Sequence, residues 1–298
     1  MTFADLMTRA MIALLRRLPV PAASGIGAGL GHLYVLQGDL RGQLWIKRAR
    51  RNVRQIIGKT DERTVNRIVY DAVRNAGRHN AEIPVLTEST RRRTRYRGLE
   101  NLKSIDGPTI LLFPHLSNWE LASLPFLDTG RALTAIYTPP ESEVVHRAIV
   151  DARLCNMQVR APGSKLIPAT ATAARDLVRA AKAGENLLIA IDEERDGLIW
   201  APAFGRLLPP AGNRFIAARL ARRFGHRLVP VSVRRQPDVT FDVTVHEPIE
   251  VPQTNDASAD IETAADRIAE FFETLIRDNL DQWYWLAELR LDRPFPKR

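Results

Sequence analysis

Residues Thr109–Phe126 read TILLFPHLSNWELASLPF. Thr109–Phe113 is a short apolar run of the length and composition expected for a buried β-strand. His115 and Glu120 follow directly, and the chain then becomes apolar again with helical spacing. Ligands in open α/β sheets bind beyond the carboxyl ends of the strands. A titratable pair at this position therefore predicts a functional site.

The chain around this stretch alternates apolar strand candidates with helical stretches. The strand candidates are Thr109–Phe113, Leu133–Tyr137, Leu187–Ile191, Arg227–Val233 and Phe241–Val245. Helical stretches lie near 117–127, 143–157, 169–183 and 213–224, and 260–289 reads as a closing amphipathic helix. Crossovers of this length join parallel strands. The sequence thus predicts an α/β fold with a mixed, largely parallel sheet flanked by helices.

The N-terminal third differs in character from the rest. Residues 43–80 show a helical apolar period with a break at Gly58–Asp61. No linker long enough to separate two domains follows, and the 298 residues suit one large α/β domain. We expect an N-terminal membrane-associating helical segment over 1–40 and a single α/β domain over 41–298.

The first helix carries an apolar stripe with arginines beside it. Its expected membrane-binding residues are Phe3, Leu6, Met7, Met11, Leu14, Leu15, Arg16 and Arg17. The following 21 residues, Leu18–Gly38, hold no charged residue, but two prolines and five glycines make a membrane span unconvincing. A helix lying in the membrane interface, with arginines toward anionic headgroups, is the preferred interpretation. The alternatives are a shallow helical hairpin or packing of the stripe on the protein's own core.

Composition narrows the partners and the compartment. The net charge is +9, yet residues 1–103 hold 20 basic against 8 acidic residues, so the remainder is slightly acidic. Such a basic third favours an anionic partner, although solvated arginine-rich helices would look the same. The single cysteine, Cys155, excludes an intramolecular disulfide and a multi-cysteine metal site. We expect Cys155 to be a small buried residue rather than a nucleophile.

The pair His115 and Glu120 suits general-base chemistry. A carboxylate on imidazole Nδ1 fixes the tautomer and leaves Nε2 free to take a proton from a hydroxyl. Five residues apart on one helix the two side chains would diverge by roughly 140°. A turn before the helix can bring them together. Spacing alone is weak evidence, since an idle exposed pair of this kind is common.

Four blocks together resemble one enzyme family. HLSNWE is similar to the His-x4-acid motif of the glycerolipid acyltransferases, and more narrowly to that of the lauroyl/myristoyl acyltransferases of lipid A biosynthesis. The other blocks are RYRGLENL before the motif, the region Leu187–Val233 with LLIAIDEERDG, APAFGR and VPVSVRR, and the terminal DQWYWLAELR. The resemblance spans about residues 95–290.

This resemblance implies a role for each matching residue. His115 would be the general base and Glu120 its orienting acid. Arg153 would stabilise the thioester oxyanion, and Asn118 would donate to the carbonyl oxygen or cap a helix. The residues implied in substrate binding are Asp192, Glu193, Phe204 and Gly205. Asp192 and Glu193 would place the acceptor or assist the histidine, and the other two would line the donor's path.

The chain departs from the family pattern at several positions. Ser117 stands where glycine is usual, and Glu193 stands where glutamine is usual. RLCNMQ replaces the usual Arg-x-Arg-Phe-Gly run around Arg153, and AELR replaces the terminal HxR. The change around Arg153 affects the assignment of the oxyanion-stabilising residue, and the change at the C-terminal block affects the identity of the acceptor.

The expected activity is an O-acyltransferase without a cofactor or a metal. It would move a fatty acyl chain from acyl carrier protein or coenzyme A to a hydroxyl of a lipid A precursor, at the cytoplasmic face of the cell inner membrane. Alternative acceptors are a lysophospholipid, an ornithine lipid and a mannosylated phosphatidylinositol. A non-enzymatic binder of anionic membranes is a rival. Nucleic acid is not an expected partner, because RRRTRYR (Arg91–Arg97) offers one tyrosine for base stacking.

Overall fold

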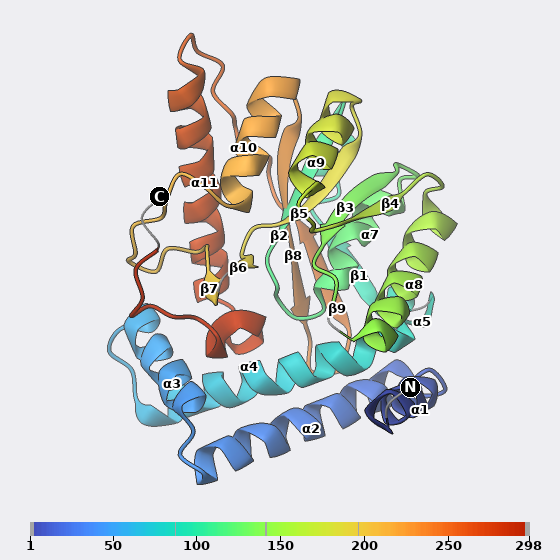
Figure 1. The fold of residues 1–298 in the computed structure, drawn as a ribbon, viewed down its shortest axis with the longest axis vertical. Helices are drawn as coiled ribbons and strands as arrows, with labels where there is room; N and C mark the ends of the chain where they lie inside the picture. Colours follow the sequence, from blue (N-terminus) through green and yellow to red (C-terminus); the bar gives the residue numbers. More distant parts are fainter. Residues whose placement is uncertain (1–2, 87, 141, 196, 296–298) are drawn as a thin grey trace.

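A seven-stranded mixed sheet forms the centre of the protein in a computed structural model that describes residues 3–86, 88–140, 142–195 and 197–295 (Figure 1). Its strand order is β1-β9-β8-β2-β5-β3-β4. These strands are β1 (Thr94–Arg97), β2 (Thr109–Phe113), β3 (Leu133–Tyr137), β4 (Lys165–Pro168), β5 (Asn186–Ala190), β8 (Arg227–Arg235) and β9 (Phe241–Val245). A small hairpin of β6 (Glu194–Arg195) and β7 (Leu198–Ile199) stands apart from this sheet.

Helices cover both faces of the sheet and continue into an N-terminal layer. The longer helices are α1 (Phe3–Leu15), α2 (Val20–Leu40), α3 (Leu44–Ile57), α4 (Glu62–Glu82), α8 (Glu143–Arg160), α9 (Ala173–Lys182), α10 (Asn213–Phe224) and α11 (Ala257–Arg277). The short ones are α5 (Glu88–Arg92), α6 (Glu100–Lys103) and α7 (Leu124–Leu127), with 3₁₀ turns η1 (Ile83–Val85), η2 (Trp119–Ser123), η3 (Leu280–Gln282) and η4 (Tyr284–Ala287).

Strand β2 lies at the centre of the sheet and is buried on both faces. It pairs in parallel with β5 and with β8. Ile110 and Leu112 pack on the core beneath α9, α10 and α11, whereas Leu111 and Phe113 pack on the opposite core, which includes α7 and residues of α8. Alternate side chains of a strand point to opposite faces, which explains why every residue of β2 is buried.

Connection length accounts for the direction of each strand. Strands β8 and β9 run antiparallel and are joined by a short turn at residues 236–240, whereas the other pairs in the seven-stranded sheet are parallel. A tight turn can join only antiparallel strands, and parallel strands need a longer crossover. The predicted mixed, largely parallel sheet is confirmed.

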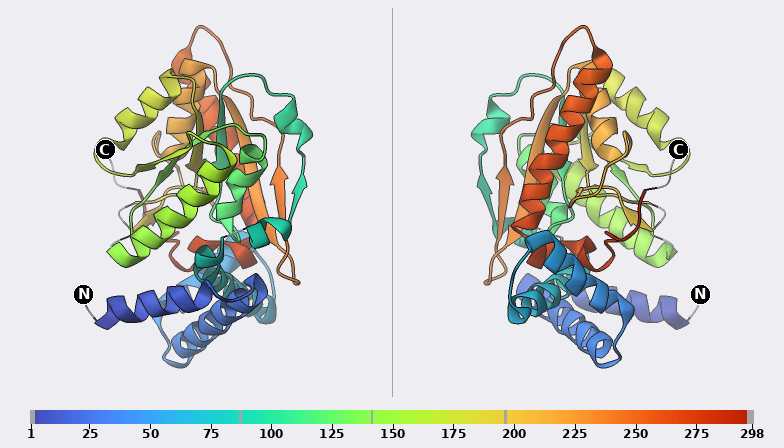
Figure 2. Two further views of the ribbon diagram at one scale, coloured as in Figure 1. Left: turned by 90° about the vertical axis from the view of Figure 1, so that its right-hand side faces the viewer. Right: turned by 90° about the vertical axis from the view of Figure 1, so that its left-hand side faces the viewer.

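The N-terminal helices form a separate layer against which the sheet rests. Helix α2 runs along α4, and both views of Figure 2 place α2 on the side of α4 away from the sheet. A Cβ atom on Gly27 would lie 2.3 Å from the carbonyl oxygen of Gly77, and one on Gly31 would lie 2.7 Å from that of Val73. The glycines of α2 therefore permit close helix packing. The boundary expected at residue 40 falls at the end of α2.

The expected stripe of the first helix is largely exposed. Leu6, Met7, Met11 and Leu14 are each between 43% and 53% exposed. Leu15 was grouped with them incorrectly, because it is only 5% exposed and packs in the core. Arg16 and Arg17 are exposed, and the side chain of Phe3 lies outside the described part of the structure. None of the helices in the described ranges has the length and apolar character needed to cross a bilayer.

Two further sequence predictions differ from the structure. The predicted helix over 260–289 ends at Arg277, and two 3₁₀ turns follow it. Cys155 is exposed rather than buried, because it lies on the solvent side of α8. Strand β4 and the β6–β7 hairpin were not predicted at all, since each is only two to four residues long.

Candidate active site

His115 and Asp192 meet because their strands are neighbours in register. Strands β2 and β5 are parallel, and Phe113 lies opposite Ala190. His115 and Asp192 each lie two residues beyond these positions, so they leave the sheet at the same height. The imidazole Nδ1 of His115 lies 2.7 Å from Oδ1 of Asp192.

The Asp192 carboxylate is fully buried and receives several donors. The backbone N–H of His115 donates to both of its oxygens at 3.1 and 2.9 Å, and the Trp283 indole N–H donates to Oδ2 at 2.8 Å. These bonds fix the carboxylate against Nδ1. A proton held on Nδ1 leaves Nε2 as an acceptor, which is the tautomer that a general base requires.

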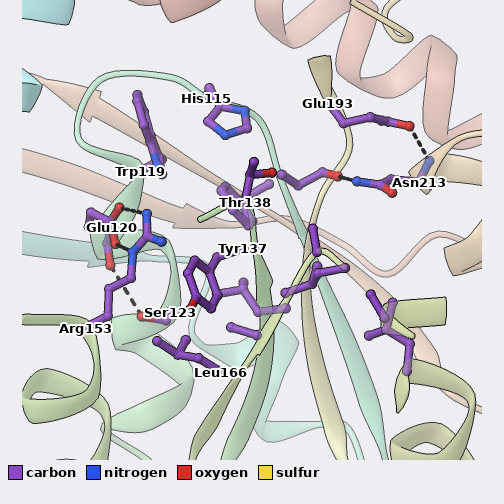
Figure 3. A pocket seen from close by; sticks show the side chains of 18 of the residues that line it. His115, Trp119, Glu120, Ser123, Tyr137, Thr138, Arg153, Leu166, Glu193 and Asn213 are labelled. Atoms are coloured by element: carbon purple, nitrogen blue, oxygen red, sulfur yellow. Dashed lines mark hydrogen bonds and ion pairs between the residues drawn. The ribbon is translucent and has the colours of Figure 1, made fainter. Parts of the chain in front are cut away.

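The structure corrects the predicted partner of His115. Glu120 lies in η2 and accepts two hydrogen bonds from Arg153 of α8, from Nε at 2.8 Å and from Nη2 at 2.5 Å. Figure 3 shows this pair, with the His115 ring on another side of the cavity. The turn after His115 directs the two side chains apart. Glu120 thus orients Arg153, and Asp192 holds the imidazole.

Ser117 marks the conformation of this turn. Its φ is +56°, in the left-handed region that glycine adopts most readily. Its backbone N–H donates to the carbonyl of Gln282 at 2.9 Å, and the carbonyl of His115 accepts from the N–H of Tyr284 at 3.0 Å. The loop after β2 is therefore held by main-chain bonds to the C-terminal block. The left-handed backbone at position 117 explains why the family pattern has glycine where this chain has Ser117.

A cavity of about 530 Å³ brings the charged residues and an apolar wall together. His115, Glu120, Arg153 and Glu193 all line it. Its apolar lining includes Phe113, Met157, Leu166, Leu177, Leu188 and Ile216. Trp119 and Trp285 flank the imidazole, with ring centroids 4.8 and 5.4 Å from that of His115. The site can therefore hold a long apolar group beside one base and one cation.

The electrostatics of Arg153 depend on Glu120. Burial alone lowers the pKa of Arg153, but the charge of Glu120 and its hydrogen bonds outweigh burial and raise that pKa above its usual value. Glu120 occupies Nε and Nη2, which leaves the N–H groups of Nη1 outside this pair. Arg153 thus stays a cation at the wall of the cavity and keeps donors for a ligand.

Asn118 lies in the protein interior rather than at the cavity. Its side chain is fully buried, makes no capping bond to η2, and donates from Nδ2 to Oε2 of Glu82 at 2.9 Å. Glu82 in turn forms a buried ion pair with Arg235 at the end of β8. Asn118 is not among the residues that line the cavity. The expectation that it donates to a substrate carbonyl or caps the helix is therefore wrong.

Phe204 and Gly205 also lie away from the cavity, contrary to the expectation that they line the donor's path. Phe204 is 5% exposed and packs edge-on against Trp283, with ring centroids 5.7 Å apart. Both residues have positive φ, +44° and +83°. They form a tight turn behind the site, and Phe204 supports the indole that binds Asp192.

Glu193 is a largely buried carboxyl at the cavity wall. Its side chain is 13% exposed, and Oε1 accepts from the backbone N–H of Asn213 at 2.7 Å, at the start of α10. A Cβ on Gly212 would lie 2.6 Å from this oxygen, and the φ of Gly212, +84°, lies in the left-handed region that favours glycine. Burial raises the pKa of Glu193 to about 8, against the opposing effect of the Asn213 bond. Glu193 is therefore mostly neutral at pH 7.

We expect Glu193→Gln to change how stability depends on pH. The folded state keeps the proton up to about pH 8, whereas the unfolded chain loses it near 4.5. The folded protein then binds the additional proton, so this group makes the free energy of unfolding fall as pH rises from 4.5 to 8, by at most about 1.4 kcal/mol per pH unit. Urea unfolding of both proteins at pH 5, 6, 7 and 8 measures this. If the free energy of unfolding changed with pH equally in wild type and Glu193→Gln, the raised pKa of Glu193 would be contradicted.

Sequence reasoning missed the aromatic residues that surround the base. Trp119, Tyr284 and Trp285 were not assigned a role at the site, yet each ring lies within contact of another or of His115. Trp283 bonds Asp192 directly. The concentration of aromatics in DQWYW was the available signal, because buried indole N–H groups usually seek an acceptor.

Comparison with known proteins shows the family of this chain. A family model described as bacterial lipid A biosynthesis acyltransferase matches residues 2–291. A search of curated proteins finds no match. One similar solved structure is the 1-acyl-sn-glycerophosphate acyltransferase PlsC from Thermotoga maritima, 13% identical with a TM-score of 0.36, covering 83% of this chain and 94% of that one. Because the family model covers nearly the whole chain, the protein belongs to the bacterial lipid A biosynthesis acyltransferases and is an acyltransferase that acts on a lipid.

Proposed function

We propose that this protein transfers a fatty acyl chain from an acyl thioester to a hydroxyl of a lipid A precursor or a related glycolipid. The observation that carries the proposal is the position of His115. Its imidazole is held by a buried carboxylate at the wall of a largely apolar cavity of about 530 Å³. The donor would be acyl carrier protein or coenzyme A in thioester linkage to the chain.

The proposed mechanism is direct attack in a ternary complex. Nε2 of His115 takes the proton from the acceptor hydroxyl while its oxygen bonds to the thioester carbonyl carbon. The tetrahedral intermediate then collapses, the C–S bond breaks, and His115 returns the proton to the leaving thiolate. Asp192 keeps the imidazole in one tautomer and stabilises the transient imidazolium. No covalent acyl-enzyme is needed.

Arg153 is the proposed stabiliser of the oxyanion. The carbonyl oxygen gains negative charge in the intermediate, and a preorganised cation in a water-poor site is most effective there. Glu120 fixes the guanidinium by two hydrogen bonds, which reduces the reorganisation needed during reaction. Glu193, as a neutral acid at the same wall, can donate a hydrogen bond to a polar group of either substrate.

The test is acyl transfer with purified full-length protein. Candidate acceptors are a lipid A precursor, a lysophospholipid, an ornithine lipid and a mannosylated phosphatidylinositol, each offered with acyl carrier protein and coenzyme A thioesters. We expect mass spectrometry to find one added acyl chain on the lipid A precursor. Acylation confined to another acceptor, or to none, would contradict the proposal.

Membrane attachment through α1 is part of the proposed function, at the cytoplasmic face of the cell inner membrane. Leu6, Met7, Met11 and Leu14 form an exposed apolar stripe, and Arg16 and Arg17 follow it in the exposed chain. Such a pattern suits a helix lying in the interface of an anionic bilayer.

We expect replacement of these four apolar residues by Gln to reduce binding to vesicles of phosphatidylethanolamine and phosphatidylglycerol by at least tenfold, because roughly 1.5–3 kcal/mol is associated with burying one large apolar side chain. Flotation of the vesicles measures it. The control replaces Val159, Val178 and Leu207 by Gln, which are exposed on other parts of the protein. An equal loss of vesicle binding in both variants would show that the stripe on α1 makes no specific contact with the membrane.

A further inference from the structure

A second cavity of about 360 Å³ lies within the N-terminal helical layer. It is lined by α2, α3, α4 and η4, and its walls are almost entirely apolar. The polar exceptions are Asn80 and Glu288. Glu288 is 58% exposed and lies 3.5 Å from Arg48, so its charge is compensated at the rim. The interior of this cavity suits hydrocarbon rather than a charged ligand.

One aromatic side chain separates this cavity from the active site. Trp285 lines both cavities, and its ring centroid lies 5.4 Å from that of His115. Tyr284 lines the second cavity and contacts both Trp119 and Trp285 edge-on. The indole nitrogen of Trp285 is buried and has no partner in the described structure. The second cavity is therefore one ring away from the catalytic base.

The outer rim of the second cavity belongs to the exposed apolar face of α2. Leu30 and Tyr34 line the cavity and are 54% and 55% exposed. They are four residues apart and so share one helix face. Leu33 and Leu40 of the same helix are 61% and 80% exposed. A contiguous exposed apolar surface of this kind marks contact with another apolar body.

We infer that the second cavity binds one hydrocarbon chain of the lipid acceptor, which enters over α2 and places the acceptor hydroxyl across Trp285 at His115. The inference rests on the proposed function. A lipid acceptor has its reactive hydroxyl on the headgroup and its chains in the bilayer, so it needs a polar position at the base and an apolar one on the membrane side. The main cavity then remains available for the acyl chain of the donor.

Ala76→Leu tests the inference, because Ala76 lines the second cavity and is absent from the lining of the main one. Leucine is a good helix former, so α4 should tolerate it. With the acyl-bearing lipid A precursor we expect KM to rise about tenfold at little change in kcat, since the added carbon atoms of leucine displace part of the bound hydrocarbon chain. KM for the same acceptor freed of its acyl chains should not change. Ala22→Leu, exposed on α2 and remote from both linings, is the matched control.

A binding experiment gives a second readout that needs no turnover. Trp45 lines the second cavity and not the main one, so a lysophospholipid with a brominated chain should quench its fluorescence. Trp285 also lines the second cavity, so the part of the quenching that Trp45→Phe removes is the signal from Trp45. Quenching should weaken in Ala76→Leu and persist in Ala22→Leu. Weakened quenching with an unchanged KM would assign the cavity to a bilayer lipid and overturn the inference.

Three other outcomes would be decisive. An equal rise in KM for the chain-bearing and chain-free acceptors would overturn the inference, because the cavity would then affect the site without binding a chain. A change in sedimentation of Ala76→Leu would assign the cavity to a second copy of the protein, with the same consequence. If the wild-type protein acylates the lipid A precursor neither with nor without its acyl chains, the proposed function fails. Weaker quenching in Ala76→Leu would in that case still support a cavity that binds a hydrocarbon chain.

Discussion

Asp192→Asn is expected to lower kcat for acyl transfer by about 10²–10⁴-fold, the range associated with a positioned general base. Asn would replace one carboxylate oxygen by an amide NH2 group, which would face an N–H donor of His115 or Trp283 instead of accepting from it. His115 would then favour the wrong tautomer. Single-turnover transfer from an acyl thioester measures the chemical step, and urea unfolding checks that the variant remains folded.

Comparison with Glu120→Gln separates the two acids. In a His115→Ala background, Asp192→Asn should cost no further activity, because residues that act as a unit are not additive. Glu120→Gln should still reduce the remaining activity there, since it acts through Arg153 rather than through the imidazole. The reverse result, with Glu120 silent and Asp192 additive, would restore Glu120 as the partner of the histidine.

The fold was predictable where the sequence pattern is local. Strands β2, β3 and β9 have the predicted bounds, as does α10, because each is an apolar or amphipathic run with clear limits. The order of the strands is not local information. Strand β5 lies between β2 and β3, although β3 comes before β5 in the chain. Periodicity alone therefore does not place Asp192 beside His115, although the family resemblance implied that Asp192 would place the acceptor or assist the histidine.

The structure brings several of the predicted site residues together, but it does not pair His115 with Glu120. His115, Glu120, Arg153 and Glu193 do line one cavity. The spacing of His115 and Glu120 suggested a pair, but the left-handed Ser117 turns the chain between them. Periodicity likewise showed which residues of α1 share a face, yet it could not show that Leu15 meets the core while Leu14 meets solvent.

The largest expected effect on stability comes from Glu82. It is fully buried at the end of α4, forms two hydrogen bonds with the Arg235 guanidinium of β8, and accepts another from Asn118. Glu82→Ala would leave a buried cation and a buried amide without this acceptor. Removing one member of such a pair typically costs about 3–5 kcal/mol. Urea unfolding should show a loss of this size, whereas Glu62→Ala, which breaks the exposed pair with Arg54, should leave the urea midpoint almost unchanged.

A double variant tests whether the loss comes from an unpaired charge or from lost packing. Glu82→Met combined with Arg235→Met removes both charges and keeps apolar volume, and replacing a buried ion pair in this way is often neutral or stabilising. We therefore expect the double variant to be more stable than either single variant. Activity should remain reduced, because Asn118 loses the Glu82 acceptor and the loop that carries His115 loses its link to α4. A double variant less stable than both single ones would instead show that the geometry of the bonds, and not the charge, holds the helical layer on the sheet.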